Sequence, residues 1–94
     1  MTARVTRVQI AQVLEIDEEF VVELERHALI ESDARGTFDP RALERVRLCW
    51  TMRHTLGLNL PGVEVVLHLL ERWERDRRRT HALLQELLEA RGRR

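Results

Sequence analysis

The sequence predicts a mainly α-helical fold with one small β-wing and a long C-terminal helix. Apolar residues recur at three- and four-residue spacing in four segments, as they do on the buried side of amphipathic helices. A short polar segment that contains a glycine, ESDARGTFD, separates the second and third segments and is typical of a hairpin or wing. After Gly62 nothing breaks the helical pattern before the basic end of the chain, which indicates one long last helix.

The first two helices have recognisable starts. Thr6 and Gln9 have the spacing of a capping box, and a short helix with one apolar side follows. Asp17 is a good N-cap for the second helix, whose first turn places carboxylates where the helix dipole favours them. The residues that we expect this second helix to bury are Val21, Leu24 and Ala28.

The wing and the third helix follow. Thr37 and Phe38 are the expected strand residues of the wing, and Asp39-Pro40 is a strong start signal for a helix that Gly57 ends. The buried side of that helix is predicted to consist of Leu43, Val46, Cys49, Trp50 and Leu56.

The fourth helix starts after Asn59, and its apolar stripe begins with Val63, Val66, Leu67, Leu70 and Trp73. A strongly charged stretch follows, and then the apolar side resumes near the end of the chain. This end is too apolar for an isolated helix, so we expect it to pair with a second chain; folding back onto the chain's own core is the alternative. The predicted dimerisation residues are Trp73, Leu84, Leu87 and Leu88.

Charge is balanced overall but segregated along the chain. Sixteen arginines cancel sixteen acidic residues, so no overall field attracts nucleic acid or anionic membrane. Residues 15–33, however, hold eight acids against Arg26 alone, a net charge of −7. Helix capping explains the acids in the first turn of the second helix, but not Glu23 and Glu25 further along.

The order of elements, together with RHTLGLNLPGVEVVLHLLERW, resembles the winged-helix domain of MerR-type regulators and, more narrowly, the chaperone modulator family CbpM. The residues that carry the resemblance are Phe38-Asp39, Met52-Arg53-His54 and the junction Leu56–Val63 with the apolar helix after it. The resemblance implies a MerR-like winged helix-turn-helix over residues 1–70 and a C-terminal helical extension for dimerisation over residues 71–94, in one compact unit. It also implies that the extension pairs antiparallel with that of a second chain, as in MerR-type dimers.

DNA-binding MerR proteins place an arginine beside aromatic residues on the second helix. The matching positions here are Val22, Glu23 and Leu24, and an acid near phosphate weakens DNA binding. The resemblance implies instead that the chain binds the J-domain of a DnaJ/CbpA-type co-chaperone and inhibits its action with DnaK. J-domains engage DnaK through a basic helix surface, which an acidic second helix would imitate.

The predicted partner-binding residues are Asp17, Glu18, Glu19, Phe20, Val22 and Glu23. A solvated, capped helix is the alternative for the acids, and packing against the wing is the alternative for Phe20. Two other functions stay open: a transcriptional regulator that contacts phosphates with Arg35, Arg41, Arg45 and the basic tail, and an assembly factor that holds DnaK and the J-protein together.

No motif predicts catalysis, a metal or a cofactor, so we expect a binding protein rather than an enzyme. The four histidines are scattered, and Cys49 has no second cysteine with which to form an internal disulfide, so we interpret it as a core residue. Because no apolar run is long enough to span a bilayer or act as a signal peptide, we expect a cytoplasmic protein.

Overall fold

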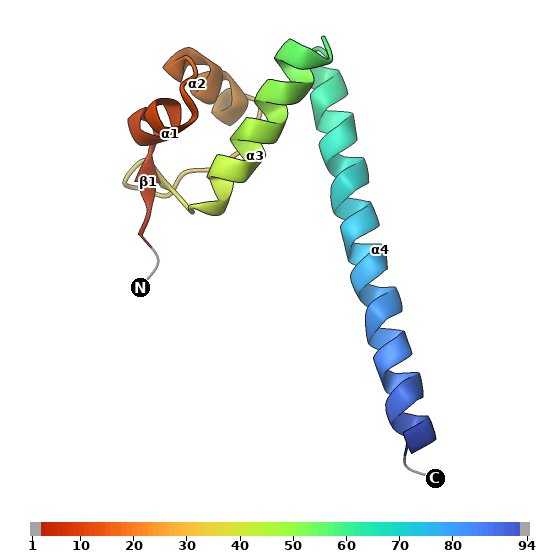
Figure 1. Ribbon diagram of the computed structural model, residues 1–94. Coiled ribbons are helices and arrows are strands. Elements are labelled where there is room, and N and C mark those ends of the chain that lie inside the picture. The colour runs from red at the N-terminus through yellow and green to blue at the C-terminus, as the bar shows by residue number, and fades with distance from the viewer. Residues whose placement is uncertain (1–2, 93–94) are drawn as a thin grey trace. The chain divides into compact units, whose positions relative to one another are not determined.

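The computed structural model describes residues 3–92 and is mainly helical with one two-stranded sheet, which confirms the predicted fold class (Figure 1). The chain divides into two compact units, Met1–Leu60 and Pro61–Arg94. The domain boundary that we place between residues 70 and 71 stays a prediction, and Arg93 and Arg94 of the predicted extension lie outside the described residues.

Strand β1 (Val5–Thr6) leads directly into helix α1 (Arg7–Leu14). The predicted capping box is present: the Thr6 hydroxyl accepts a hydrogen bond from the Gln9 N–H at 3.2 Å, and Gln9 Oε1 accepts one from the Thr6 N–H at 2.8 Å. The chain leaves α1 at Glu15, whose left-handed φ of 56° turns it toward the next helix.

Helix α2 (Glu18–Arg26) follows, with Asp17 at its N-cap position as predicted, although the Asp17 side chain makes no capping hydrogen bond. Val21 and Leu24 are fully buried, also as predicted. The inward side of the helix is therefore apolar, and its outward side is left to the charged residues.

The expectation that Ala28 belongs to the core is wrong. Helix α2 ends at Arg26, and Ala28 lies beyond it, exposed and with a left-handed φ of 58°. The Leu29 N–H then donates to the Leu24 carbonyl at 2.9 Å, which closes the end of the helix. Leu29 and Ile30 take the buried positions instead.

The wing contains strand β2 (Thr37–Phe38), which pairs antiparallel with β1. Val5 lies opposite Phe38 and Thr6 opposite Thr37. The sequence predicts β2 but gives no local signal for β1, because a two-residue strand is defined only by its partner, which here lies more than thirty residues away.

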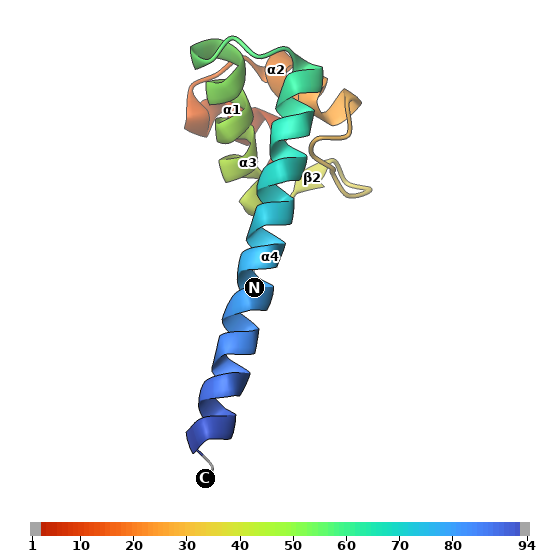
Figure 2. The ribbon, with the colours of Figure 1, turned by 90° about the vertical axis from the view of Figure 1, so that its right-hand side faces the viewer.

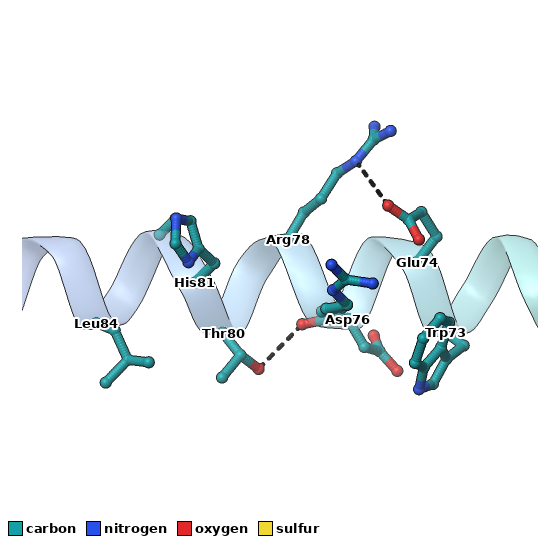
Figure 3. A pocket seen from close by; sticks show the side chains of 9 residues that line it. Trp73, Glu74, Asp76, Arg78, Thr80, His81 and Leu84 are labelled. Atoms are coloured by element: carbon teal, nitrogen blue, oxygen red, sulfur yellow. Dashed lines mark hydrogen bonds and ion pairs between the residues drawn. The ribbon is translucent and has the colours of Figure 1, made fainter.

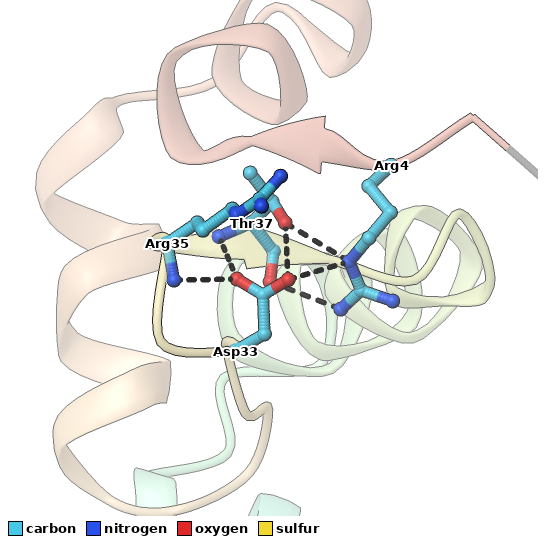
Figure 4. Close-up of polar contacts among 4 residues, drawn as sticks. All are labelled: Arg4, Asp33, Arg35 and Thr37. Atoms are coloured by element: carbon cyan, nitrogen blue, oxygen red, sulfur yellow. Dashed lines mark hydrogen bonds and ion pairs between the residues drawn. The ribbon is translucent and has the colours of Figure 1, made fainter.

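Asp33 holds the wing turn together (Figure 4). Its Oδ1 accepts hydrogen bonds from the backbone N–H groups of Thr37 at 2.8 Å and Arg35 at 3.0 Å, and its Oδ2 accepts one from the Thr37 hydroxyl at 2.7 Å. The Arg4 guanidinium lies 3.0 Å from the same carboxylate. These contacts, the bond from the Thr37 N–H foremost, lower the pKa of Asp33 to about 2.

Helix α3 (Arg41–Trp50) continues into a π-helical turn, η1 (Thr51–Thr55), before Gly57 at φ 70° ends it as predicted. The helix starts one residue later than the Asp39-Pro40 signal predicts, because Pro40 and not Asp39 occupies the N-cap position. Asp39 Oδ1 accepts a hydrogen bond from the Arg41 N–H at 2.9 Å. The predicted burial of Leu56 is wrong: its side chain is 65% exposed, because it lies at the C-cap of the π turn, where the helical periodicity has ended.

The core of the first unit draws on each of its larger elements. Val46 and Cys49 of α3 are fully buried, as predicted, and burial raises the pKa of the Cys49 thiol to about 11, which keeps it protonated. The fully buried side chains of this unit are Ile10, Val21, Leu24, Phe38, Val46 and Cys49.

Helix α4 (Leu60–Gly92) forms the second unit from Pro61 onward and is seen in Figure 2 from a second direction. Its start at Leu60 follows Asn59 as the sequence predicts. Val63 and Leu67 are buried in its first turns, whereas almost every described residue from Leu69 onward is exposed. Within residues 3–92 no helix is long and apolar enough to cross a membrane.

Candidate partner-binding surface on α2

The outward side of α2 carries the acidic residues that the sequence singles out. Glu18, Glu19 and Glu23 are exposed, and Val22 among them is half-buried. Because successive residues of a helix are turned by about 100°, burying Val21 and Leu24 forces these four side chains toward solvent. Asp17 is also exposed and lies at the start of the same helix.

A shallow depression of about 410 Å³ brings part of this set together. It is lined by Glu19, Val22, Glu23 and Arg26. Three of the predicted partner-binding residues thus share one patch, and the sequence analysis missed Arg26. Arg26 follows Glu23 by three residues, and Glu23 follows Glu19 by four, so the helical spacing could have identified Arg26 as a neighbour of both acids.

The exposed carboxylates of α2 and its N-cap, which with Val22 we call the acidic surface of α2, have no partner within the described part of the chain. No ion pair or hydrogen bond there involves the side chains of Asp17, Glu18, Glu19 or Glu23. Unpaired exposed acids on one helix leave a negative surface that a basic partner can neutralise.

Glu25 differs from its neighbours because its own chain neutralises it. Its Oε2 lies 2.7 Å from Arg7 Nη2, and its Oε1 accepts the Ser32 hydroxyl at 2.7 Å. The hydrogen bond from Arg7, then that from Ser32, lowers the pKa of Glu25. The Glu25 carboxylate, whose position helix capping does not explain, therefore links α1, α2 and the segment after α2. It is not part of the exposed acidic surface.

Phe20 lies in the core and not on the surface. It is 6% exposed, and its ring meets the Trp50 ring edge-on with centroids 5.1 Å apart. His54 lies 5.7 Å from Phe20 and stacks on Trp50 at 3.7 Å. The structure thus corrects the assignment of Phe20 as a contact residue. Its ring packs α2 against α3 and η1, on the side of α2 that faces the core.

Two of the three arginines that the DNA-binding hypothesis requires, Arg41 and Arg45, make polar contacts within the chain. Arg45 Nε donates to the Leu29 carbonyl, and Arg41 lies 3.4 Å from the Asp39 carboxylate. Arg4 is bound to the wing through Asp33 and Thr37. The face of α2 itself carries net negative charge.

The predicted dimerisation residues lie on one side of α4. Given 100° per residue, Leu84, Leu87 and Leu88 project within about 60° of Trp73. All four side chains are more than half exposed, from 53% for Leu84 to 67% for Leu87. Figure 3 shows Trp73, Thr80 and Leu84 on the same side of the helix, whereas Glu74 and Arg78 point to the opposite side. The Arg77 guanidinium lies 5.5 Å from the centre of the Trp73 ring.

Comparison with known proteins identifies the family. The model of the MerR HTH family regulatory proteins matches residues 5–85. The chain belongs to the MerR HTH family. Within it, the chain is 27% identical over 79 residues to the chaperone modulatory protein CbpM of Coxiella burnetii strains Dugway 5J108-111, RSA 331 / Henzerling II and CbuG_Q212. These alignments cover 80% of this chain and 74% of each relative.

The family match confirms the winged-helix reading, and the similarity to CbpM confirms the narrower resemblance drawn from the junction Leu56–Val63. This MerR-like chain differs from a DNA reader at the helix that should contact bases, where the structure leaves Glu19 and Glu23 exposed. Among the described residues no group of three or more histidine, cysteine or acidic side chains is placed to hold a metal ion.

Proposed function

We propose that this protein is a chaperone modulator that binds the J-domain of a DnaJ/CbpA-type co-chaperone and inhibits its action with DnaK. The observation that carries the proposal is the set of exposed, unpaired carboxylates on α2, at the position where MerR-type proteins read DNA. The similarity to proteins named chaperone modulatory protein CbpM supports the class of function.

We expect electrostatic attraction to bring the J-domain to the acidic surface of α2. A basic helix surface of the J-domain meets Glu19 and Glu23, with Val22 between them. While it is held there, that surface is not free to engage DnaK, so inhibition follows from competition for one basic surface. Because the carboxylates are exposed, salt screens the attraction, and the association rate falls as ionic strength rises.

The test is a charge reversal with a matched control. In calorimetric titrations with the J-domain of the co-chaperone encoded in the same genome, Glu19→Lys with Glu23→Lys should weaken binding about tenfold or more, since two attractions become repulsions. The control, Glu44→Lys with Glu89→Lys, makes the same change in net charge at exposed positions outside α2 and should bind as the wild type does. Equal affinity of all three proteins would place the contact elsewhere.

Inhibition and assembly are separated by a second readout. If the chain competes with DnaK, adding it lowers the ATPase rate of DnaK that the J-protein stimulates, and the charge-reversed variant restores that rate. A rate that rises with added protein would instead favour an assembly factor.

The family match itself favours a second candidate, a DNA-binding transcriptional regulator. It would contact phosphates with Arg35, Arg41 and Arg45. Titration of labelled duplex DNA at about 0.15 M salt tests this, because specific DNA binders reach nanomolar affinity there. Tight binding that depends on sequence would replace the chaperone proposal.

We further propose that two chains pair antiparallel through α4. Residues 66, 70, 73, 77, 80, 84, 87 and 91 follow one another at alternating spacings of four and three, which is the seam of a coiled coil. Trp73, Leu84 and Leu87 lie on this seam, and Leu88 lies beside it. Antiparallel pairing sets Trp73 of each chain beside Leu84 of the other and covers apolar side chains that are exposed in one chain.

A further inference from the structure

A groove with four apolar and two polar lining residues lies in the first unit, near the ends of α1 and α3. Its volume is about 430 Å³. The residues that line it are Val13, Leu14, Ile16, Arg47, Trp50 and Thr51. Val13 is 66% exposed, whereas Leu14, Ile16 and Trp50 are half-buried, so the groove presents apolar side chains to solvent.

Two residues of the groove connect it to α2. Ile16, which lines it, lies between Glu15 and Asp17 in the chain, and both of these acids are exposed. Trp50, which also lines it, is in edge-on contact with Phe20 of α2. Two exposed carboxylates therefore flank Ile16 in the chain, and Arg47 of α3 adds a positive charge to the lining.

The acidic surface lacks the apolar centre that a protein interface needs. Specific interfaces place a desolvated apolar core inside a polar rim. On α2 the burial of Phe20 leaves only the half-buried Val22 among the predicted contact residues to supply such a core. The groove supplies it a few residues away, with Trp50 as an aromatic anchor of the kind that dominates binding energy.

We infer that the J-domain docks across both features: basic residues on the acids of α2, and an apolar side chain of the same helix surface in the groove. This inference rests on the proposed function and adds the apolar half of its interface. The occupant is a helix whose basic residues flank an apolar one, because exposed acids flank Ile16 in the chain and four of the six lining residues are apolar.

The test compares two valines of one helix. Val13→Gln removes the exposed apolar side chain of the groove, and Val8→Gln makes the same change on α1 at a position 47% exposed and outside the groove. Neither changes net charge, and glutamine favours helix more than valine does. Val13→Gln should bind the J-domain about tenfold more weakly, the loss expected when one buried aliphatic side chain is removed. Val8→Gln should keep the wild-type affinity.

A fluorescence titration gives an independent readout. In a Trp73→Phe background that keeps the wild-type oligomeric state in ultracentrifugation, Trp50 is the one remaining tryptophan. A tryptophan-free J-domain seated in the groove should shift the Trp50 emission to shorter wavelength and protect it from a soluble quencher.

The outcomes separate the two proposals. If the wild type binds and the α2 charge reversal weakens binding, but Val13→Gln binds normally and the Trp50 emission does not move, the groove is overturned and the proposed function stands. If the wild type does not bind the J-domain at all, both fall. If Val13→Gln lowers the oligomeric state in solution, a second copy of the chain occupies the groove and the inference is wrong.

Discussion

Replacing Phe20 with leucine separates support of the acidic surface from direct contact. Phe20 is 6% exposed, and its ring lies edge-on to Trp50, with an interplanar angle of 88° and centroids 5.1 Å apart. Such an aromatic pair is worth about 0.5–1.5 kcal/mol beyond its buried area. The change of shape in a packed core costs up to about 1.5 kcal/mol more.

We therefore expect Phe20→Leu to lower the free energy of unfolding by about 1–2 kcal/mol, which corresponds to a midpoint roughly 5–15 °C lower for a domain of this size. Urea and thermal unfolding followed by circular dichroism measure this change. At a temperature well below the midpoint, the affinity for the J-domain should match that of the wild type, because the ring faces the core.

The matched control is Val22→Ala, two residues away on the outward side of the same helix. Because Val22 is half-buried on the surface, its truncation should change stability by about 0.5 kcal/mol or less and should weaken J-domain binding. If Phe20→Leu keeps full stability and loses affinity, Phe20 is a contact residue and the reasoning from its burial is refuted.

Two other predictions concern the wing and α4. The pKa of Asp33 is lowered to about 2 from an ordinary value of 3.8, so its contacts stabilise the fold above about pH 4, and this stabilisation is lost as the pH falls from 4 toward 2. The unfolding midpoint of Asp33→Asn should therefore fall less than that of the wild type over this pH range. Parallel curves of midpoint against pH for the two proteins would contradict the role assigned to Asp33. If two chains pair through α4 as proposed, Leu84→Arg with Leu87→Arg should sediment as a monomer in analytical ultracentrifugation. Ala82→Arg with Gln85→Arg, which adds the same charge off the seam, should sediment as a dimer. A wild-type chain that is already monomeric would rule out pairing through α4.

The sequence predicts those elements whose signals are local. The Thr6–Gln9 capping box, the wing strand at Thr37 and the stop at Gly57 are each encoded within a few residues, and all are present in the structure. The acids of α2 are exposed for the same reason, because the spacing of Val21 and Leu24 alone decides which side of the helix faces the core.

Features that depend on distant partners could not be predicted in this way. Strand β1 exists through its pairing with β2, and Glu25 is removed from the free surface by Arg7, eighteen residues earlier. Phe20 is drawn inward by Trp50 of another helix. Ala28 continues the helical spacing of α2, but the helix closes before it. A pattern read along one helix contains none of these contacts.

The most direct test of the central claim is a map of the amide signals of the isotope-labelled protein during titration with the J-domain. We predict that the largest changes in amide chemical shift fall on residues 17–23 of the α2 segment, with further changes at Val13 and Trp50. Shifts confined to the arginine-rich part of α4, residues 72–79, with the α2 signals unmoved, would contradict it.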